Sequence, residues 1–416
     1  MRAEIITIGD ELLRGFVVDT NAAYIGKKLL EVGIKPFWVT TVGDDQNTLL
    51  QAFTLAAQRV ELVFVTGGLG PTHDDVTKKV ACKFFDSELV FNQLVFKKIV
   101  ELFQQRGVEM PAINEEQAWI PKKAQLILNE VGTAPGFIFN KDGCYFFIMP
   151  GVPQEMKAMM EGAVIPFLIN HKLTQNQTIQ YQILRTTGIM ESQLYEKLSV
   201  DLANIENLVE LAFVPTVRGV DLRLTAIGKS AKECRRRIAS AESLIRRKVD
   251  DYIYGVNEET LEQKVAELLF ANKQTIAVAE SCTGGLISNM LTNISGSSHY
   301  FERGIVAYSN QAKVDILGVS IETLRKFGAV SSETAGEMAE GVRRLARTNF
   351  GLSTTGIAGP TGGTPQKPVG LVYIGLANGS TTIVEKYQFH HDRLRNKQRT
   401  AYAALNLLRR RLLKKV

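Results

Sequence analysis

The first 170 residues alternate between two hydrophobic patterns. Short continuous apolar runs, such as residues 3–8 (AEIITI) and 60–65 (VELVFV), predict strands that are buried on both faces. Between them, residues 21–33 (NAAYIGKKLLEVG) and 47–59 (NTLLQAFTLAAQR) repeat apolar positions every three or four residues and predict amphipathic helices. Strands that alternate with helices indicate right-handed βαβ units and a parallel, doubly wound sheet.

Local signals add detail to this domain. Thr20 or Asn21 is the expected N-cap of the first long helix, and Gly33 is its expected stop. Farther along, residues 137–149 (FIFNKDGCYFFIM) predict a β-hairpin that turns at the KDG sequence.

The pattern changes after the polar segment 170–178. The next 80 or so residues contain half-exposed, alternating strands and two helices, which is typical of a small α+β unit. Strand–helix alternation then returns, and the chain ends in a long helix over roughly residues 392–413. The predicted fold class is therefore α/β, with two doubly wound three-layer αβα domains joined by a small α+β middle domain. The expected domains span residues 1–170, 176–255 and 258–416.

Composition narrows the functional classes only slightly. The 416 residues are 45% hydrophobic and 22% charged, which is ordinary for globular proteins, and the net charge of +6 is mild. An anionic small molecule fits this charge as well as a nucleic acid does. The four cysteines are far apart and form no C-x-x-C pair, which indicates neither a disulfide framework nor a zinc site. Because the N-terminus has no signal-peptide pattern and no apolar segment approaches about 20 residues, we expect a cytoplasmic protein that does not contact membranes.

Acids and glycines follow the first three predicted strands. The loops are residues 9–11 (GDE), 43–45 (GDD) and 66–75 (TGGLGPTHDD). The carboxyl ends of the strands in a doubly wound sheet share one edge, where ligands bind, so the loops should converge. They carry six acids: Asp10, Glu11, Asp44, Asp45, Asp74 and Asp75.

The glycines of the third loop would let the backbone approach a phosphate. Carboxylates repel a phosphate unless a hard divalent cation such as Mg²⁺ lies between them, so the combination predicts metal-assisted chemistry on a phosphate ester or anhydride. The alternative for each single acid is a helix cap or an ordinary turn. His73 occupies the last glycine position of a dinucleotide fingerprint, and no P-loop is present.

A second candidate site lies in residues 279–285 (AESCTGG). Ser281 is expected at a strand-to-helix junction, near the positive end of the helix, and Gly284 and Gly285 would expose N–H groups for a phosphate or an oxyanion. Serine needs a base, but no histidine stands out, and the G-x-S-x-G and S-x-x-K patterns are absent. Lys313 and Tyr308 could supply the proton chemistry if their strand lies beside that of Ser281, because desolvation would lower the pKa of the lysine.

Other readings of these residues stay open. Ser281 could be a helix N-cap, Cys282 is a rival nucleophile, and Lys313 could be a solvated helix residue. Residues 354–363 (TTGIAGPTGG) form another glycine-rich loop suited to a phosphate or ribose. Arg395 on the final helix could clamp a phosphate or be an ordinary surface arginine.

Three motifs of the first domain resemble one known family. The sequences TIGDELLRG, TGGLGPTHDDVTKK and PGVPQEM are similar to the molybdopterin-binding-like domain of the CinA family, over roughly residues 1–170. The resemblance implies a metal-dependent ADP-ribose pyrophosphatase. It assigns Asp10, Asp44 and Asp75 to the metal, and the phosphate loop would contain Gly67, Gly68, Gly70 and Thr72.

The last domain resembles the C-terminal domain of the same family over roughly residues 260–416. The matching motifs are AESCTGG, GSSHYFERGIVAYSNQAK, GAVS and TGIAGPTGG. This resemblance implies a nicotinamide mononucleotide amidohydrolase that needs no metal, with Ser281 as the nucleophile and Lys313 and Tyr308 as the proton-transfer groups. The substrate-binding residues would be Thr283, Gly284, Gly285, Gly356, Ala358, Gly359, Gly362, Gly363 and Arg395.

The sequence thus predicts a bifunctional pyridine-nucleotide salvage enzyme, and family membership suggests a homodimer. Two other classes remain open. One is a non-catalytic scaffold that binds a nucleotide or a pterin. The other is a competence or DNA-damage accessory factor that uses the basic helix over residues 232–248, although basic residues on one helix are usually a solvated face, so nucleic acid is not the expected partner.

Overall fold

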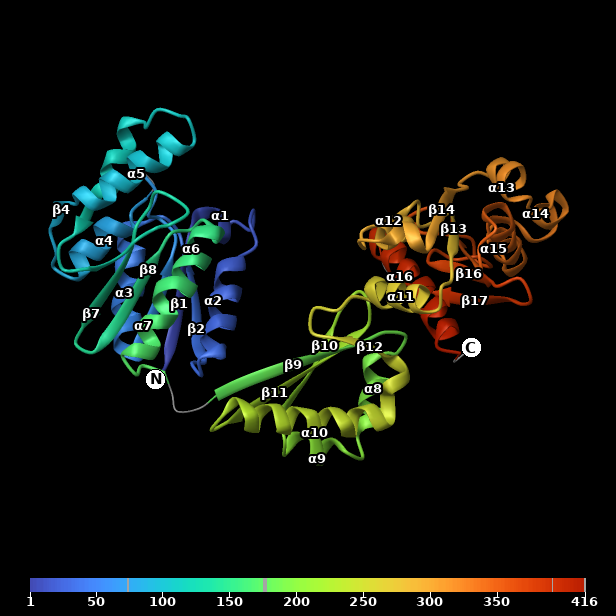
Figure 1. Ribbon diagram of the computed structural model, residues 1–416, viewed down its shortest axis with the longest axis horizontal. Helices are drawn as coiled ribbons and strands as arrows, with labels where there is room; N and C mark the ends of the chain where they lie inside the picture. Colours follow the sequence, from blue (N-terminus) through green and yellow to red (C-terminus); the bar gives the residue numbers. More distant parts are fainter. Residues whose placement is uncertain (73–74, 175–177, 391, 415–416) are drawn as a thin grey trace. The chain divides into compact units, whose positions relative to one another are not determined.

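The computed structural model describes residues 1–72, 75–174, 178–390 and 392–414. The chain forms two compact units, one of residues 1–180 with 227–235 and the other of residues 181–226 with 236–416. Figure 1 shows both, and each is described by itself. The expected division into three domains stays a prediction.

A six-stranded sheet organises the first unit. Its order is β2-β1-β3-β8-β7-β6. The strands are β1 (Ala3–Ile8), β2 (Pro36–Val42), β3 (Leu62–Thr66), β6 (Gln125–Ile127), β7 (Gly136–Lys141) and β8 (Cys144–Met149). The first three strands and β8 are parallel to one another, whereas β7 is antiparallel to both β8 and β6. The sheet is therefore mixed, although the strand–helix alternation of the sequence predicts a parallel sheet. The hairpin predicted over residues 137–149 is the β7–β8 pair.

Helices cover both faces of this sheet. They are α1 (Asp10–Leu13), α2 (Thr20–Glu31), α3 (Gln46–Arg59), α4 (Thr77–Phe84), α5 (Gln93–Gln105), α6 (Pro153–Met159) and α7 (Ile165–Asn170). Alternate residues of β1 enter different cores: Ile6 and Ile8 pack on the side of α3, α4 and α5, whereas Ala3 and Ile5 pack on the side of α2, α6 and α7. Burial on both faces explains why the strands are continuous apolar runs.

The observed cap of α2 differs from the expected one. The Asp19 carboxylate accepts a hydrogen bond from the Ala22 N–H at 2.8 Å, so Asp19 is the N-cap, and Thr20 is the first helical residue. Gly33 follows the helix with a φ of +80°, as a stop signal requires.

The middle segment forms a four-stranded sheet in the order β10-β11-β9-β12. Its strands are β9 (Thr178–Thr186), β10 (Glu210–Pro215), β11 (Val220–Gly228) and β12 (Ile253–Val256). Its helices are α8 (Glu191–Leu198), α9 (Leu202–Glu206) and α10 (Ala231–Val249). This is the α+β arrangement that the sequence predicts.

The last part of the chain contains a five-stranded sheet in the order β14-β13-β15-β16-β17. The strands are β13 (Ile276–Glu280), β14 (Phe301–Val306), β15 (Phe350–Gly356), β16 (Leu371–Ala377) and β17 (Thr382–Gln388). Strand β13 is parallel to its two neighbours, β14 and β15, whereas β16 and β17 run antiparallel to the strands before them.

The helices of this part again form two outer layers. One face packs against α11 (Leu261–Ala271), α12 (Leu286–Thr292) and α16 (Arg393–Leu412), and the other packs against α13 (Asn310–Leu317), α14 (Ile321–Phe327) and α15 (Ser332–Ala346). The predicted three-layer α/β class is confirmed. In the described ranges of the chain, no helix combines the length and apolar character that a membrane span requires.

A buried arginine joins α16 to the end of the middle segment within the second unit. The Arg409 side chain is 2% exposed and donates hydrogen bonds to Asp251 O at 2.6 Å and to Ile253 O at 3.2 Å. The last helix is therefore fixed to the residues that lead into the five-stranded sheet.

Candidate functional site

The loops after β1 and β2 meet at the carboxyl edge of the first sheet. The Asp10 N–H donates to Asp44 Oδ2 at 3.0 Å, and the Asp44 N–H donates to Asp10 Oδ1 at 3.4 Å. Arg14 Nη2 donates to Asp10 Oδ2 at 2.5 Å. The expected convergence of these two loops is thus observed, with two carboxylates side by side and one cation beside them.

The neighbouring acids have different contacts. Asp45 caps α3, because its carboxylate accepts from the Thr48 N–H at 2.8 Å, and this hydrogen bond lowers the pKa of Asp45. The Asp75 carboxylate accepts from the Thr72 N–H at 2.8 Å and from Thr72 Oγ1 at 2.6 Å, which closes a turn. Asp74 lies outside the described residues.

The glycines of the third loop are required by close packing. Gly67 and Gly68 have φ values of +118° and +64°. A Cβ on Gly67 would lie 2.3 Å from Ile8 O, and one on Gly68 would lie 2.2 Å from Thr77 Oγ1. A Cβ on Gly70 would lie 2.6 Å from Asp75 Oδ2. The loop therefore packs directly on the end of β1 and the start of α4, at the same edge as the acids.

The donor set limits how a metal could bind here. Within the described ranges, no three His, Cys, Asp or Glu side chains are grouped to hold an ion. The expected trio of Asp10, Asp44 and Asp75 is therefore not assembled, because the Asp75 carboxylate contacts Thr72. Two adjacent carboxylates still suit Mg²⁺, which often binds one or two carboxylates together with substrate phosphates.

The second site lies at the carboxyl edge of the five-stranded sheet. Lys313 Nζ lies 3.1 Å from Ser281 Oγ, and it donates to Ala307 O at 2.8 Å and to Tyr308 O at 3.0 Å. Ser281 follows β13, and Lys313 lies on α13 after β14, which pairs with β13 as the sequence predicts. Parallel pairing therefore brings together two residues that are 32 positions apart.

The environment of this pair favours a neutral amine. Lys313 is 1% exposed and Ser281 is 8% exposed. Burial lowers the pKa of Lys313, and we find no ion pair to this lysine in the described ranges. The reading of Lys313 as a solvated residue is therefore wrong.

The neighbouring cysteine has the opposite character. Cys282 is buried, and burial raises the pKa of its thiol to about 12. A thiol with such a pKa is almost entirely protonated near pH 7, and the thiolate is the nucleophilic form. The geometry and charge thus favour Ser281 over Cys282 as the nucleophile.

The turn after Ser281 differs from the expected helix start. Helix α12 begins at Leu286 with Gly285 as its N-cap residue, so Ser281 is neither the cap nor in the first turn. The sequence predicts that the Gly285 N–H is free to bind an oxyanion. Instead, this N–H donates to Glu280 Oε2 at 2.9 Å. Thr283 is buried, and its hydroxyl lies 2.8 Å from the Thr354 hydroxyl.

Tyr308 occupies the exposed rim of the site. Its side chain is 62% exposed, and its hydroxyl accepts a hydrogen bond from Arg393 Nη2 at 3.2 Å. Arg393 Nη1 also donates to Gly359 O at 2.8 Å. In the described part of the chain, the Tyr308 hydroxyl makes no hydrogen bond to Ser281 or Lys313; the contact to Lys313 comes from its carbonyl.

The sequence did not indicate two cations of α16, Arg393 and Lys397, that lie close to the predicted site residues. Arg393, which was not selected, bridges the tyrosine and the glycine-rich loop, whereas the selected Arg395 is exposed and lies 3.6 Å from Asp392 Oδ2. Lys397 was also not selected, and its Nζ lies 3.4 Å from the position of a Cβ on Gly284. The sequence signal was only a cluster of basic residues at the start of a helix.

The glycine-rich loop over residues 354–363 packs against the segment before β16. A Cβ on Gly356 would lie 2.7 Å from Leu371 O, and one on Gly359 would lie 2.5 Å from Val369 Cγ1. Gly362 has a φ of +87°, which favours glycine. A Cβ on Gly363 would lie 2.8 Å from Val369 N. Asn396 Nδ2 donates to the carbonyl of the buried Ala358 at 3.0 Å, which ties this loop to α16.

A pocket of about 380 Å³ opens beside the serine turn. Its lining includes Thr283, Gly284, Gly285, Asn289, Lys397 and Gln398. Three of these are residues that the family resemblance assigns to substrate binding. The pocket thus places a cation and two amide side chains next to the expected substrate contacts.

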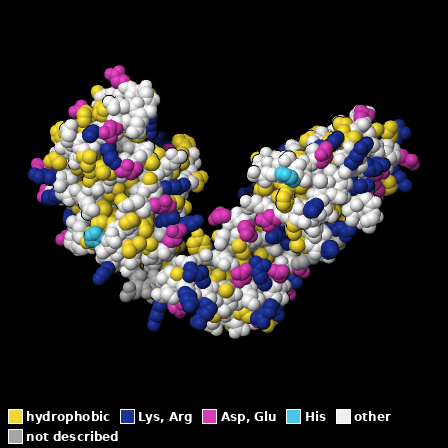
Figure 2. Space-filling view, in the orientation of Figure 1, with side chains coloured by type: hydrophobic (Ala, Val, Ile, Leu, Met, Phe, Trp, Pro, Cys, Tyr) yellow, Lys and Arg dark blue, Asp and Glu magenta, His cyan; other side chains and the backbone are white. Residues whose placement is uncertain are grey.

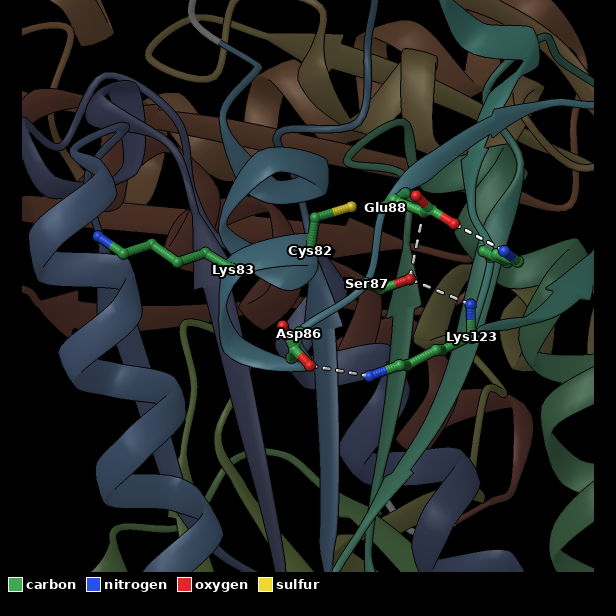
Figure 3. Close-up of a pocket in the computed structure, with 7 residues that line it drawn as sticks. Cys82, Lys83, Asp86, Ser87, Glu88 and Lys123 are labelled. Atoms are coloured by element: carbon green, nitrogen blue, oxygen red, sulfur yellow. Dashed lines mark hydrogen bonds and ion pairs between the residues drawn. The ribbon is translucent and has the colours of Figure 1, made fainter.

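A larger hollow of about 720 Å³ lies in the first unit, next to the end of α4 (Figure 3). It contains none of the predicted site residues. Lys122 Nζ lies 2.6 Å from Glu88 Oε1, and Lys123 Nζ lies 3.2 Å from Asp86 Oδ2. These ion pairs neutralise two of its three lysines, so the hollow offers little net charge to a ligand.

Comparison with known proteins agrees with this arrangement. Three family models match consecutive parts of the chain: a probable molybdopterin binding domain over residues 4–170, the damage-inducible protein CinA KH domain over 181–255, and the CinA C-terminal domain over 258–412. A "Putative competence-damage inducible protein" of Caldicellulosiruptor saccharolyticus is 44% identical over 99% of this chain and 100% of its own length. The chain belongs to the CinA family.

One further relative is similar over nearly its whole length, and one solved structure is similar over a part of the chain. A "CinA-like protein" of Kosmotoga olearia is 47% identical over 99% of both chains. A crystal structure of a competence/damage inducible protein from Agrobacterium tumefaciens is 41% identical over 36% of this chain and 91% of its own, with a TM-score of 0.35.

Proposed function

We propose that this CinA-family chain hydrolyses the carboxamide of nicotinamide mononucleotide at the Ser281 site. The observation that carries the proposal is the 3.1 Å contact between Lys313 Nζ and Ser281 Oγ, two residues that are both buried. A buried lysine of lowered pKa can be neutral near pH 7, and a neutral amine can take the proton of a serine hydroxyl.

The reaction follows from these two groups. Ser281 Oγ attacks the carboxamide carbon while its proton passes to the neutral Lys313 amine. The tetrahedral intermediate collapses, the protonated Lys313 returns the proton to the leaving nitrogen, and ammonia departs. Water then attacks the acyl-enzyme and gives a proton to the neutral Lys313 amine. As the ester bond breaks, Lys313 returns this proton to Ser281 Oγ, which restores the hydroxyl and frees nicotinate mononucleotide.

The surrounding residues supply orientation. Tyr308, held by Arg393 at the rim, can contact the carboxamide as it enters. The pocket that contains Lys397 suits an anionic phosphate, because a lysine ammonium attracts phosphate as a point charge.

The decisive experiment is a direct assay. The purified full-length chain is incubated with nicotinamide mononucleotide, and ammonia and nicotinate mononucleotide are followed together. Equal release of both products that is lost in Ser281→Ala supports the proposal. No release from the folded wild-type protein contradicts it.

We propose a second activity, ADP-ribose pyrophosphatase, at the Asp10–Asp44 edge of the first sheet. Its support is the contact between these two acids and the tight Gly67–Gly68 loop at the same edge. A bound divalent cation would be held by Asp10 and Asp44 and would neutralise the charge of a pyrophosphate. The loop backbone and Thr72 would orient the phosphates.

The alternatives have weaker support. A nucleotide- or pterin-binding scaffold would bind these ligands without turnover, which the same assays detect. For nucleic acid, Figure 2 shows Lys and Arg side chains over the middle segment with acidic side chains among them. Arg246 pairs with Glu242 and Asp250, and Lys248 pairs with Asp201, so the basic helix α10 is partly neutralised.

We further propose that the enzyme works in the cytoplasm as a homodimer. Analytical ultracentrifugation of the full-length chain tests the oligomeric state.

A further inference from the structure

A buried carboxylate lies immediately before the proposed nucleophile and takes no part in the reaction as written. Glu280 is the last residue of the interior strand β13, and it is 0% exposed. Glutamate is almost never fully buried unless its charge is paired or hydrogen-bonded. The contacts of this side chain therefore indicate why it is there.

The Glu280 carboxylate accepts four hydrogen bonds, all from residues 285–288, at the end of the turn that contains Ser281 and at the start of α12. Oε2 accepts from the Gly285 N–H at 2.9 Å and the Ile287 N–H at 3.1 Å. Oε1 accepts from the Ser288 N–H at 2.8 Å and from Ser288 Oγ at 2.7 Å. One side chain thus closes the turn of residues 281–285 onto the start of α12.

The backbone around Glu280 fixes the other end of the same turn. The Ala307 N–H donates to Glu280 O at 2.9 Å, and the Ser281 N–H donates to Thr354 O at 3.0 Å. Ala307 also supplies one of the carbonyls that hold Lys313 Nζ. Glu280 is therefore next to the nucleophile in the chain, and its carbonyl is linked to Lys313 Nζ by two hydrogen bonds through Ala307.

We propose that Glu280 is a positioning residue for Ser281. It holds the turn closed, so that Ser281 Oγ stays within reach of Lys313 Nζ before any ligand arrives. This inference deepens the proposed deamidation and rests on it for the identity of the substrate. It concerns the reactivity of Ser281, which can be measured without that substrate.

The test substitutes Glu280→Gln in the full-length chain. A carboxamide has one acceptor oxygen and one donor NH₂, so at least one backbone N–H that now donates to Glu280 must face a donor, and the turn must shift. Labelling of Ser281 by a fluorophosphonate probe and kcat should both fall roughly 10- to 100-fold, the size of loss expected when a reacting group is misplaced by about 1 Å. KM should change less than about threefold, because the pocket lining is retained.

Ser288→Ala provides the matched control, because it removes one of the four donors and leaves the others. It should lower the labelling rate only about threefold, in proportion to one lost hydrogen bond. The Ser288 hydroxyl can also turn to accept from the new amide of E280Q, so the double variant E280Q/S288A should lose more than the product of the single losses. Circular dichroism and melting temperature report whether each variant is folded.

Several outcomes would overturn the inference. One is a folded E280Q that keeps labelling and kcat within about twofold of wild type, and another is a rise in KM alone. If E280Q does not fold, an S288A variant with an unchanged labelling rate overturns it. A wild-type protein that labels at Ser281 in a Lys313-dependent manner but releases no ammonia would refute the deamidation and leave the positioning role standing. A wild-type protein whose Ser281 does not label at all refutes both.

Discussion

The Arg393 guanidinium donates one hydrogen bond to the Tyr308 hydroxyl and another to the Gly359 carbonyl, so the last helix holds the tyrosine that follows β14. We expect Arg393→Ala to lower kcat for deamidation by about tenfold, because the phenol loses its orientation. In a Tyr308→Phe background the same substitution should have little further effect, since the hydroxyl it orients is gone. Steady-state kinetics of the four proteins measure this coupling.

Arg395 supplies the comparison for that experiment. If it clamps the substrate phosphate as the sequence suggests, Arg395→Ala should raise KM and leave kcat nearly unchanged. Additive losses from R393A and Y308F would show that Arg393 does not act through Tyr308.

The two adjacent candidate nucleophiles can be separated by substitution. We expect Ser281→Ala to reduce deamidation by a factor on the order of 10⁴ or more, because the acyl-enzyme cannot form. Cys282→Ala should keep activity within a few-fold, because the buried thiol has its pKa raised to about 12 and stays protonated. Ammonia release by equal amounts of folded protein is the measurement, and the reverse pattern would identify a thiol enzyme.

The pH dependence of deamidation should report Lys313. Its pKa is lowered by burial, and only the neutral amine accepts the serine proton, so kcat/KM should rise with pH up to that lowered pKa and then level off. The midpoint should therefore lie below the ordinary lysine value of 10.5. Lys313→Arg should abolish this limb along with most activity, since a guanidinium stays protonated. If kcat/KM stays constant between about pH 6 and 9, Lys313 does not act as the base, unless its amine is already neutral at pH 6.

The acids of the first site provide a matched pair at neighbouring positions. Asp44→Asn should lower ADP-ribose cleavage at least about 100-fold, whereas Asp45→Asn should mainly weaken the cap of α3, by about 1 kcal/mol of unfolding free energy. Release of AMP and a thermal melt distinguish the two effects. Cleavage that survives in D44N and is lost in D45N would mean that the wrong acid was assigned.

Removal of the metal separates the two activities. EDTA should abolish ADP-ribose cleavage and leave ammonia release from nicotinamide mononucleotide unchanged, because the proposed serine–lysine reaction uses no metal. Added Mg²⁺ should restore the cleavage. Simultaneous loss of both activities would argue against two independent sites.

The sequence predicts the layers and the principal contact well for a physical reason. Continuous apolar runs mark strands that are buried on both faces, and parallel neighbours share a carboxyl edge, so Ser281 and Lys313 could be placed together without coordinates. The direction of a strand is harder to predict from the sequence, because a continuous apolar run is compatible with parallel and with antiparallel pairing. The antiparallel β16 and β17 were therefore not distinguished from parallel strands.

Individual side chains at the sites were harder to assign. Asp44 and Asp45 are adjacent acids, and only the backbone geometry shows that the second caps a helix while the first meets Asp10. Arg393 and Arg395 are two residues apart at a helix start and point to different sides of the helix, and the sequence does not show which of them reaches Tyr308. Glu280 gave no signal, because a glutamate at the end of a strand normally faces water.

The buried Arg409 has a practical consequence for expressing parts of this chain. Its two carbonyl partners, at residues 251 and 253, precede the CinA C-terminal domain, which begins at residue 258. A fragment that starts at residue 258 would therefore leave this buried guanidinium without those acceptors. Fragment boundaries drawn from family matches alone would cut between the two halves of this anchor. A shortened version that starts before residue 251 keeps the anchor whole.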